Sequence, residues 1–506
     1  MTSTRTAGAP PPSLRAGAPW PARGEARTLA RQGNLIPVCR DILADLETPV
    51  SAFLKTHRGP YGFLLESVEG GEKWGRYSFL GTEPAQIFRA RGGLVEVETP
   101  GAEPVRQTVA DPLTVLRDLL AAYRPVAVPG LPRFAGGAVG HIAYDMVRNF
   151  ERLPVRAADD LGLPDACLLL ATSLLVFDSL AQKIKVVSHA HVRAGVSAEV
   201  AYDEAVARID ELVARLGAPP VEPVQPVASP GEVRSNFTQE QYEAAVARAQ
   251  AYIRAGDVIQ VVPAQRFELP LAAHPFNVYR CLRTVNPSPY MFFLALGDHT
   301  LAGASPEVMV RVENGEVNVR PIAGTRPRGT SERDDAALAA ELAVDPKELA
   351  EHVMLLDLGR NDVGRVARTG TVQVTERFVI ERYSHVMHLV SNVRGELAPG
   401  RDCFDAFRAT FPAGTLTGAP KIRAMEIIEE LEPVRRGVYG GAVGYFSFSG
   451  SMDTCICIRT ALMHRGRVYF EAGGGVVADS SPEGEYRESM NKARAMIQAV
   501  RLAEAL

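Results

Sequence analysis

Acidic side chains recur at helical spacing in two distant stretches of the chain. The stretch GEYRESMNK places Glu485 and Glu488 one helical turn apart, with Lys492 a further turn along the same face. The stretch KELAEH repeats the arrangement with Glu348 and Glu351. Carboxylate oxygens suit a hard divalent cation, and Mg2+ would bind through a few of them while keeping waters for a substrate. On spacing alone, however, such a pair on a helix is more often a solvated face.

A glycine triplet and a lone arginine precede the second acidic stretch. Gly473, Gly474 and Gly475 lead from an apolar strand pattern into the predicted helix, and glycines let backbone N–H groups approach an anion closely. A tight turn without any ligand is the commoner meaning of an isolated triplet. Arg459 ends the apolar pattern CICIRT, where a guanidinium needs an anionic partner. An internal salt bridge and a bound anion explain it equally well.

The elements that must position these side chains form a mixed α and β pattern. Residues 237–257 predict an amphipathic helix that begins with a capping box of Thr238 and Gln241, and residues 258–262 predict a strand. Residues 438–477 contain three apolar strand patterns joined by glycine-containing turns, which predicts an antiparallel meander. Strands and helices do not alternate regularly, so a doubly wound parallel sheet is disfavoured.

Length and composition predict a globular protein of two unequal parts. The chain has 506 residues, of which 46% are hydrophobic and 23% charged. Residues 1–32 are rich in Ala, Pro and Arg and predict a disordered extension. We expect an N-terminal region over 33–216, a proline-rich linker over 217–233 and a second region over 234–506. The most apolar run, residues 166–178, is shorter than the ~20 residues that cross a bilayer and predicts a buried strand.

Charge and cysteine usage exclude several classes of protein. The 55 Lys and Arg residues against 59 Asp and Glu give a net charge of -4, without the basic stripe of a nucleic-acid binder. No Cys-x-x-Cys pair and no secretory signal pattern occur, which predicts a cytoplasmic protein in a reducing environment. No cysteine sits in the Gly-x-Cys-x-Gly setting of a glutaminase nucleophile. The six cysteines are Cys39, Cys167, Cys281, Cys403, Cys455 and Cys457.

Several long motifs resemble one family in the order in which they occur. They are PIAGTRPRG, KELAEHVMLLDLGRNDVGRV, RYSHVMHLVSNVRG, FPAGTLTGAPKIRAMEIIEELEP, YGGAVGYFSFSGSMDTCICIRT and the segment 473–492. Together they resemble the chorismate-utilising enzymes, and most of all the anthranilate synthase component I family. GPYGFLLESVEGGEKWGRYSFLG and PRFAGGAVGHIAYDMVRNFE extend the resemblance into the first half. The resemblance implies an α+β fold, a large, mostly antiparallel β-sandwich core flanked by helices.

The resemblance also implies a Mg2+ site and a chorismate site. The four glutamates Glu348, Glu351, Glu485 and Glu488 match the family's Mg2+ cluster, with Glu351 and Glu488 as direct ligands. The metal would hold the ring carboxylate of chorismate. Further matches to substrate contacts are Gly324, Thr325, Tyr439, Arg459, Gly473, Gly475 and Lys492.

Four residues match the family's catalytic positions. Glu307 matches the general acid that protonates the departing ring hydroxyl, and Thr415 matches a threonine that contacts the substrate. His388 matches the histidine of the second step, loss of pyruvate and aromatisation, and we discount His385 as a metal ligand beside it. Gln260 stands where water-adding relatives carry a lysine base, which favours ammonia as the nucleophile.

These matches imply the large subunit of an anthranilate synthase, a carbon–oxygen lyase at the first committed step of tryptophan biosynthesis. It would aminate chorismate and eliminate pyruvate to give anthranilate. Aminodeoxychorismate synthase is the nearer alternative, but its relatives with a covalent intermediate carry a lysine where this chain has Ala323. A non-catalytic sensor of chorismate or tryptophan is the second alternative, which the retained site residues disfavour.

The resemblance implies feedback control and a partner subunit. Glu66 and Ser67, with Pro289, Tyr290 and Met291, resemble the two segments that enclose the inhibitor tryptophan in family members. An edge strand and a loop that only pack together remain an alternative for these segments. Ammonia would come from a separate glutamine amidotransferase subunit, in a heterotetramer with two copies of each subunit.

Overall fold

Two large antiparallel sheets organise the protein in the computed structural model, which describes residues 17–67, 75–225, 231–383 and 386–506. The first sheet has eleven strands. In spatial order they are β1 (Leu35–Leu43), β10 (Lys183–His191), β9 (Ser173–Asp178), β3 (Tyr77–Thr82), β2 (Tyr61–Glu66), β14 (Tyr290–Leu296), β15 (His299–Ser305), β24 (Thr460–His464), β25 (Arg467–Gly473), β13 (Ala264–Pro270) and β11 (Arg234–Ser235).

The second sheet faces the first. Its spatial order is β18 (Ile322–Pro327), β20 (Val386–Glu396), β17 (Glu316–Val319), β16 (Val308–Glu313), β23 (Met452–Ile456), β22 (Ala442–Ser447), β7 (Gly137–Ile142), β8 (Ala166–Ala171), β4 (Gln86–Arg91), β5 (Leu94–Glu98) and β6 (Val105–Thr108). The strand β19 (Gln373–Arg382) also pairs with β20, and β12 (Gln260–Val261) forms a separate short pair with β21 (Gly418–Ala419).

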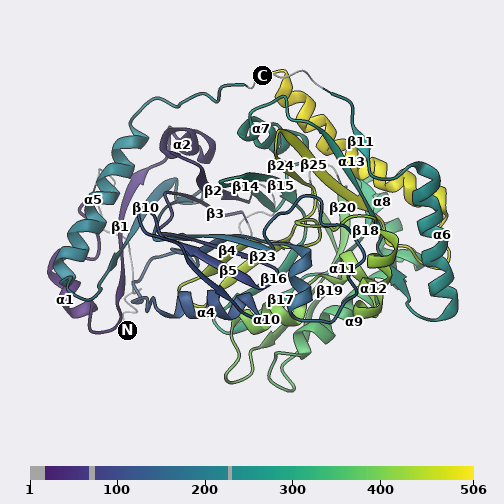
Figure 1. Cartoon of the computed structure of the whole chain (residues 1–506), viewed down its shortest axis with the longest axis horizontal. Helices are drawn as coiled ribbons and strands as arrows, with labels where there is room; N and C mark the ends of the chain where they lie inside the picture. Colours follow the sequence, from purple (N-terminus) through teal and green to yellow (C-terminus); the bar gives the residue numbers. More distant parts are fainter. Residues whose placement is uncertain (1–16, 68–74, 226–230, 384–385) are drawn as a thin grey trace.

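Helices cover the outer faces of both sheets. Figure 1 shows α1 and α5 at one end of the molecule and α6 and α13 at the other. The helices are α1 (Ala26–Leu29), α2 (Pro49–Thr56), α4 (Pro112–Ala121), α5 (Ala198–Leu216), α6 (Gln239–Ala255), α7 (Pro275–Val285), α8 (Glu332–Val344), α9 (Pro346–Gly364), α10 (Cys403–Thr410), α11 (Gly414–Thr417), α12 (Lys421–Leu431) and α13 (Pro482–Glu504), with short 3-10 turns at Arg23–Glu25 and Tyr144–Asn149.

Three of the apolar cores follow from this layering. One core lies under the helices of the first sheet, one under the helices of the second, and a third lies between the sheets. Phe79 and Leu462 from the first sheet meet Val443 and Cys455 from the second in this third core. The predicted α+β class, with a mostly antiparallel sandwich flanked by helices, is confirmed.

The two parts of the chain predicted from the sequence build both sheets together. In the first sheet, β2 from the N-terminal part pairs with β14 from the C-terminal part. In the second, β7 pairs with β22. Residues 217–225 have no helix or strand, as expected of a connection. The two sequence regions therefore share their hydrophobic cores.

Some predicted elements are confirmed and others are wrong. The capping box at the start of α6 is present, with Thr238 Oγ1 accepting from the Gln241 amide. The apolar run 166–178 is two strands, β8 and β9, one in each sheet. The predicted meander is two hairpins, β22–β23 and β24–β25, also in different sheets. An apolar strand pattern looks the same whether the chain stays in one sheet or passes to the other, because both are buried.

The predicted N-terminal extension is partly ordered. Trp20 forms a bridge with Cys39, and Ala26 is fully buried against the first sheet. Arg23 also pairs with Asp203 of α5 at 2.7 Å. The prediction of disorder is therefore wrong for residues 20–29. A few contacts with the first sheet and α5 order this segment, and composition alone does not reveal them.

Candidate active site

The two acidic stretches are the first turns of two helices. Helix α9 begins at the N-cap Asp345, whose side chain accepts from the Lys347 and Glu348 amides at 3.0 and 3.2 Å. Helix α13 begins at Ser481, which accepts from the Gly484 amide at 3.2 Å. Proline follows each cap and preorganises the first turn. Negative side chains near these ends are favoured by the helix dipole.

The carboxylates of both helices converge on the glycine turn that follows β25. A β-carbon on Gly474 would collide with Glu485 and lie 3.6 Å from Glu488 Oε1. A β-carbon on Gly475 would collide with the Gln260 amide and lie 3.7 Å from Glu351 Oε1. A larger residue at either position would force the end of the Glu485 or Gln260 side chain to move.

Glu348 lies at the edge of this group. A β-carbon on Gly324, which has a φ of 66°, would lie 3.0 Å from Glu348 Oε2. The structure thus places Glu348 beside Gly324, and the other three glutamates beside the glycine turn.

The pKa values of two of these glutamates are raised, because the carboxylates are buried and lie close to one another. Burial raises the pKa of Glu351, and the neighbouring Glu348 and Glu488 raise it further. Burial also raises the pKa of Glu485, against a hydrogen bond from Ser480. Like charges at close range disfavour ionisation, so a cation would lower the free energy of the ionised group.

Internal cations neutralise two of these acids. Arg326 Nη1 lies 3.1 Å from Glu348 Oε1, and Lys492 Nζ lies 2.7 Å from Glu488 Oε1. Glu485 Oε2 is buried and has no hydrogen-bond partner in the part of the chain that the structure describes. Among those same residues, no three His, Cys, Asp or Glu side chains lie close enough together to hold a metal.

Arg459 occupies the corner between β23 and β24, where the chain passes from one sheet to the other. Its φ of 51° lies in the left-handed region, which costs energy for any residue except glycine. Burial lowers the pKa of Arg459, while Tyr439 and Glu488 act in the opposite sense. No carboxylate among the described residues forms an ion pair with this guanidinium. The internal salt bridge that the sequence left open is therefore absent from the described chain.

Lys492 and His388 border the same site. Lys492 Nζ donates to the carbonyl of Gly473 at 2.8 Å. His388 Nδ1 lies 3.1 Å from the Gly324 carbonyl and 3.0 Å from Thr325 Oγ1. Burial lowers the pKa of His388 and the nearby Arg459 lowers it further. His385, discounted above, lies outside the described residues.

Glu307 and Thr415 line one small cavity between the second sheet and α9–α11. Glu307 follows β15 and is 8% exposed. Burial raises the pKa of Glu307 to about 8, against contacts with Thr415 and the Ile322 amide that favour the charged form. A carboxyl that holds its proton near neutral pH can act as a general acid.

Gln260 reaches the glycine turn from β12. Its side chain is 2% exposed, and its Oε1 has no hydrogen-bond partner within the described ranges. An acceptor left unpaired in the interior costs free energy unless a ligand donates to it. The structure thus brings predicted reaction-site residues together in three groups: Gln260, Lys492 and three of the glutamates beside the glycine turn, His388 beside Gly324 and Thr325, and Glu307 beside Thr415. Arg459 lies near Tyr439, Glu488 and His388.

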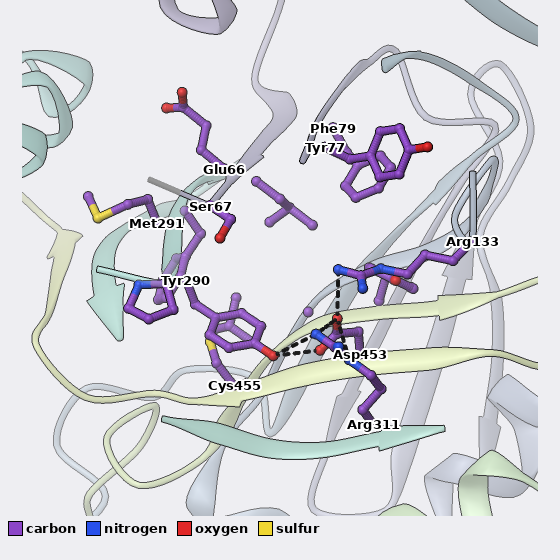
Figure 2. A pocket seen from close by; sticks show the side chains of 16 residues that line it. Glu66, Ser67, Tyr77, Phe79, Arg133, Tyr290, Met291, Arg311, Asp453 and Cys455 are labelled. Atoms are coloured by element: carbon purple, nitrogen blue, oxygen red, sulfur yellow. Dashed lines mark hydrogen bonds and ion pairs between the residues drawn. The ribbon is translucent and has the colours of Figure 1, made fainter. Parts of the chain in front are cut away.

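A separate pocket lies between the two sheets (Figure 2). All five residues predicted to bind tryptophan line it: Glu66, Ser67, Pro289, Tyr290 and Met291. Tyr77, Phe79 and Tyr445 add aromatic walls. The two segments, more than two hundred residues apart, meet because β2 pairs with β14 and Met291 lies opposite Glu66.

Sequence reasoning missed the charged floor of this pocket. Figure 2 shows Asp453 joined to Tyr290, Arg311 and Arg133. Tyr290 Oη donates to Asp453 Oδ1 at 2.9 Å, and Arg311 Nε donates to Oδ2 at 3.0 Å. Arg133 lies 3.3 Å from the same carboxylate. A charged residue inside the apolar pattern SMDTCICIR was the signal available in the sequence.

Two strands that line the pocket lead directly to residues of the reaction site. Val443 and Tyr445 line the pocket from β22, which begins shortly after Tyr439. Asp453 lines it from β23, which ends shortly before Arg459. A shift of these two strands would reach both sites.

The six cysteines are buried and unpaired. Burial raises the pKa of Cys39, Cys167, Cys403 and Cys457 to about 12, so these thiols stay protonated. Across the described ranges, no helix combines the length and apolar character needed to span a membrane.

Comparison with known proteins identifies relatives along nearly the whole chain. The family described as chorismate binding enzyme matches residues 63–498. Anthranilate synthase component 1 of Pseudomonas aeruginosa is 52% identical over 490 residues, which cover 95% of this chain and 99% of that protein. The protein of the same name from Acetivibrio thermocellus is 45% identical over 489 residues, 95% of this chain and 98% of that protein.

Solved structures agree. Anthranilate synthase component I from Streptococcus pneumoniae has a TM-score of 0.75 at 37% identity, over 90% of this chain and 98% of that one. The menaquinone-specific isochorismate synthase from Escherichia coli has a TM-score of 0.68 at 18% identity, over 94% of this chain and 98% of that one, and shows a shared fold. The chain therefore belongs to the chorismate-binding enzymes, in the anthranilate synthase component I group.

Proposed function

We propose that this chain is the aminating subunit of an anthranilate synthase, which converts chorismate and ammonia to anthranilate and pyruvate. Arg459 is the observation that carries the proposal. Its partly buried guanidinium has no carboxylate partner among the described residues, and it lies near Tyr439 and Glu488. A planar guanidinium in this state favours a planar carboxylate ligand. Chorismate offers two carboxylates, one for Arg459 and one for the acidic group.

The oxygen donors of the acidic residues suit Mg2+ chemically, although no three of the described carboxylates lie close enough together to hold a metal, so binding the ion would draw them together. The buried Glu485 Oε2 also has no partner in the described chain. Glu351 and Glu488 would bind the ion directly, with Glu348 and Glu485 around them. When bound, Mg2+ would supply the positive charge that holds the ring carboxylate.

Glu307 would start the reaction. Its neutral carboxyl donates a proton to the ring hydroxyl of chorismate, the carbon–oxygen bond breaks, and water leaves. Ammonia forms the new carbon–nitrogen bond and loses a proton to solvent. A hydroxyl is a poor leaving group unless it is protonated, so the raised pKa of Glu307 suits this role.

His388 would complete the reaction as a base. Its Nδ1 faces the Gly324 carbonyl, which can only accept, so Nδ1 carries the hydrogen and Nε2 keeps its lone pair. Nε2 takes the proton from the ring carbon that bears nitrogen. The bond between the ring and the enolpyruvyl oxygen then breaks, the ring becomes aromatic, and the enolate that leaves takes up a proton at its methylene carbon to become pyruvate.

Two residues favour amination to anthranilate over the alternatives. An amide such as Gln260 cannot deprotonate water, whereas its unpaired Oε1 can accept from ammonia. Ala323 is buried in β18 and offers no amine for a covalent intermediate. Both features argue against isochorismate and aminodeoxychorismate as products.

Tryptophan is the ligand we propose for the pocket of Figure 2. Aromatic walls suit an indole, and the charged floor and Glu66 suit an amino acid's ammonium and carboxylate groups. Inhibition would act through β22 and β23, which line the pocket and connect it along the chain to Tyr439 and Arg459.

A separate glutaminase subunit is the ammonia source we propose. The buried, protonated cysteines cannot supply a glutaminase nucleophile. The name component 1 of the relatives itself implies a second component.

One experiment tests the proposal. The purified chain is incubated with chorismate, MgCl2 and an ammonium salt, and the products are separated and identified by fluorescence and mass. Anthranilate and pyruvate in equal amounts are expected. Aminodeoxychorismate or isochorismate as the product would replace the proposal with a relative's activity, and the absence of turnover would favour a sensor.

A further inference from the structure

A fully buried ion pair lies behind the reaction site. Glu432 and Arg436, which follow α12, are 7% and 3% exposed. Arg436 donates to both oxygens of Glu432, from Nε at 2.9 Å and from Nη2 at 2.6 Å. Glu432 Oε1 also accepts from the Ala264 amide at 2.9 Å.

The remaining donors of Arg436 hold two other segments. Nη1 donates to the Leu416 carbonyl at 2.7 Å, and Nη2 donates to the Val262 carbonyl at 2.6 Å. Leu416 directly follows Thr415, and Val262 lies two residues after Gln260. The guanidinium therefore ties together two segments, each carrying a residue of the proposed site.

A third segment packs on the same guanidinium. Its central carbon lies 5.5 Å from the centre of the Tyr439 ring and 4.9 Å from that of Tyr144. The Tyr439 amide also donates to the Arg436 carbonyl at 3.1 Å, which closes the turn between them. Cation–π contact and turn together fix the ring of Tyr439.

Stability alone does not explain an arginine here. Replacing a buried ion pair by apolar groups of similar volume is often neutral or stabilising, because desolvation offsets the Coulomb attraction. An apolar side chain could not, however, donate to three acceptors in one plane. What Arg436 adds is the relative placement of the segments it joins.

We propose that Arg436 is a positioning residue that fixes Gln260, Thr415 and Tyr439 relative to one another for the amination of chorismate. The inference rests on the proposed function. Arg436 donates its hydrogen bonds to protein acceptors, whereas Arg459 has no carboxylate partner among the described residues, so the two arginines have different roles. Arg459 binds the substrate, and Arg436 orders the wall around it.

The test is a double variant, Glu432→Gln with Arg436→Met, which removes both charges and keeps the length of the side chains. Ammonium-dependent anthranilate formation is measured together with the melting temperature and the thermal shift caused by tryptophan. We expect a folded protein whose kcat falls about 100-fold, since a misplacement of about 1 Å has that effect. The KM for chorismate should change less than about threefold, because Arg459 and the acidic group remain.

A matched control keeps the result interpretable. Lys185 and Asp41 form another largely buried pair, at 2.6 Å, between β10 and β1 of the first sheet, and its hydrogen bond does not reach the segments of Gln260, Thr415 or Tyr439. Lys185→Met with Asp41→Asn should change stability and leave kcat near that of the wild type.

A second variant covers the case in which the first fails to fold. Arg436→Ala leaves a hole that a guanidinium ion fits, so millimolar guanidinium should restore part of the lost kcat and sodium at equal ionic strength should not. Wild-type kcat in the folded double variant, equal losses in the control, or absence of rescue would overturn the inference. A wild type without anthranilate formation would instead refute the proposed function and the positioning role with it.

Discussion

Replacing Glu307 by glutamine should lower activity and, at alkaline pH, raise the stability of the protein. The change keeps the shape of the side chain and removes its proton. With a pKa of about 8, about nine-tenths of the Glu307 carboxyls are protonated at pH 7 and can act as acids. Glu307→Gln should therefore lower kcat by about 10²- to 10⁴-fold, the range of general acid catalysis. Chorismate binding should change little.

The same substitution should stabilise the protein at alkaline pH. The pKa of Glu307 is raised from its ordinary 4.5 to about 8 in the folded state, so between these values the folded state binds more protons than the unfolded state. The free energy of unfolding of the wild type then falls as pH rises through this window. The upper limit of the loss is about 4 to 5 kcal/mol, from about 1.4 kcal/mol per pH unit. A glutamine at position 307 carries no charge at any pH, so the variant does not lose this free energy of unfolding.

The assay follows anthranilate fluorescence at fixed free ammonia, and denaturant unfolding at several pH values from 5 to 9. Glu316→Gln, at the start of β17 and with a side chain that is 40% exposed, is the control and should change neither quantity. Normal turnover in Glu307→Gln would refute the role of Glu307 as the general acid. An equal pH dependence of unfolding in wild type and variant would refute the raised pKa.

Four further outcomes are expected. Glu351→Gln and Glu488→Gln should each nearly abolish turnover, because each removes a full charge from the Mg2+ site. Chelation of divalent ions should do the same to the wild type. Near-normal rates of either variant at saturating Mg2+ would contradict the metal assignment. His388→Gln should accumulate an aminated intermediate that chromatography detects, and anthranilate formation without it would remove His388 from the second step. Ser67→Phe should relieve tryptophan inhibition without loss of turnover, and equal inhibition of both proteins would argue against the pocket of Figure 2. The purified chain should use ammonium salts and ignore glutamine, and glutamine-dependent turnover without a second polypeptide would exclude a separate glutaminase.

The sequence by itself determined the local geometry of the candidate site. Helical spacing placed Glu348 with Glu351 and Glu485 with Glu488 on common faces, because the helix repeat fixes which side chains are neighbours. The capping box of Thr238 and Gln241 marked where α6 begins, and the glycine triplet preceded the start of α13. These signals are short-range, so a single sequence contains them in full.

Only the tertiary structure decided which distant segments meet. Apolar strand patterns did not reveal that the chain changes sheet between β8 and β9, or at Arg459, since a strand buried in either sheet has the same pattern. The pairing of β2 with β14 made one pocket from two distant segments.

The environment of each ionisable group could not be predicted from the sequence either. Burial gives Glu307 its raised pKa, and packing leaves Arg459 without a carboxylate among the described residues while Arg436 is satisfied three times over. Nothing in the residue types distinguishes these two arginines. Charge and hydrogen bonding depend on what long-range folding places within a few ångströms, and that is a property of the packed chain.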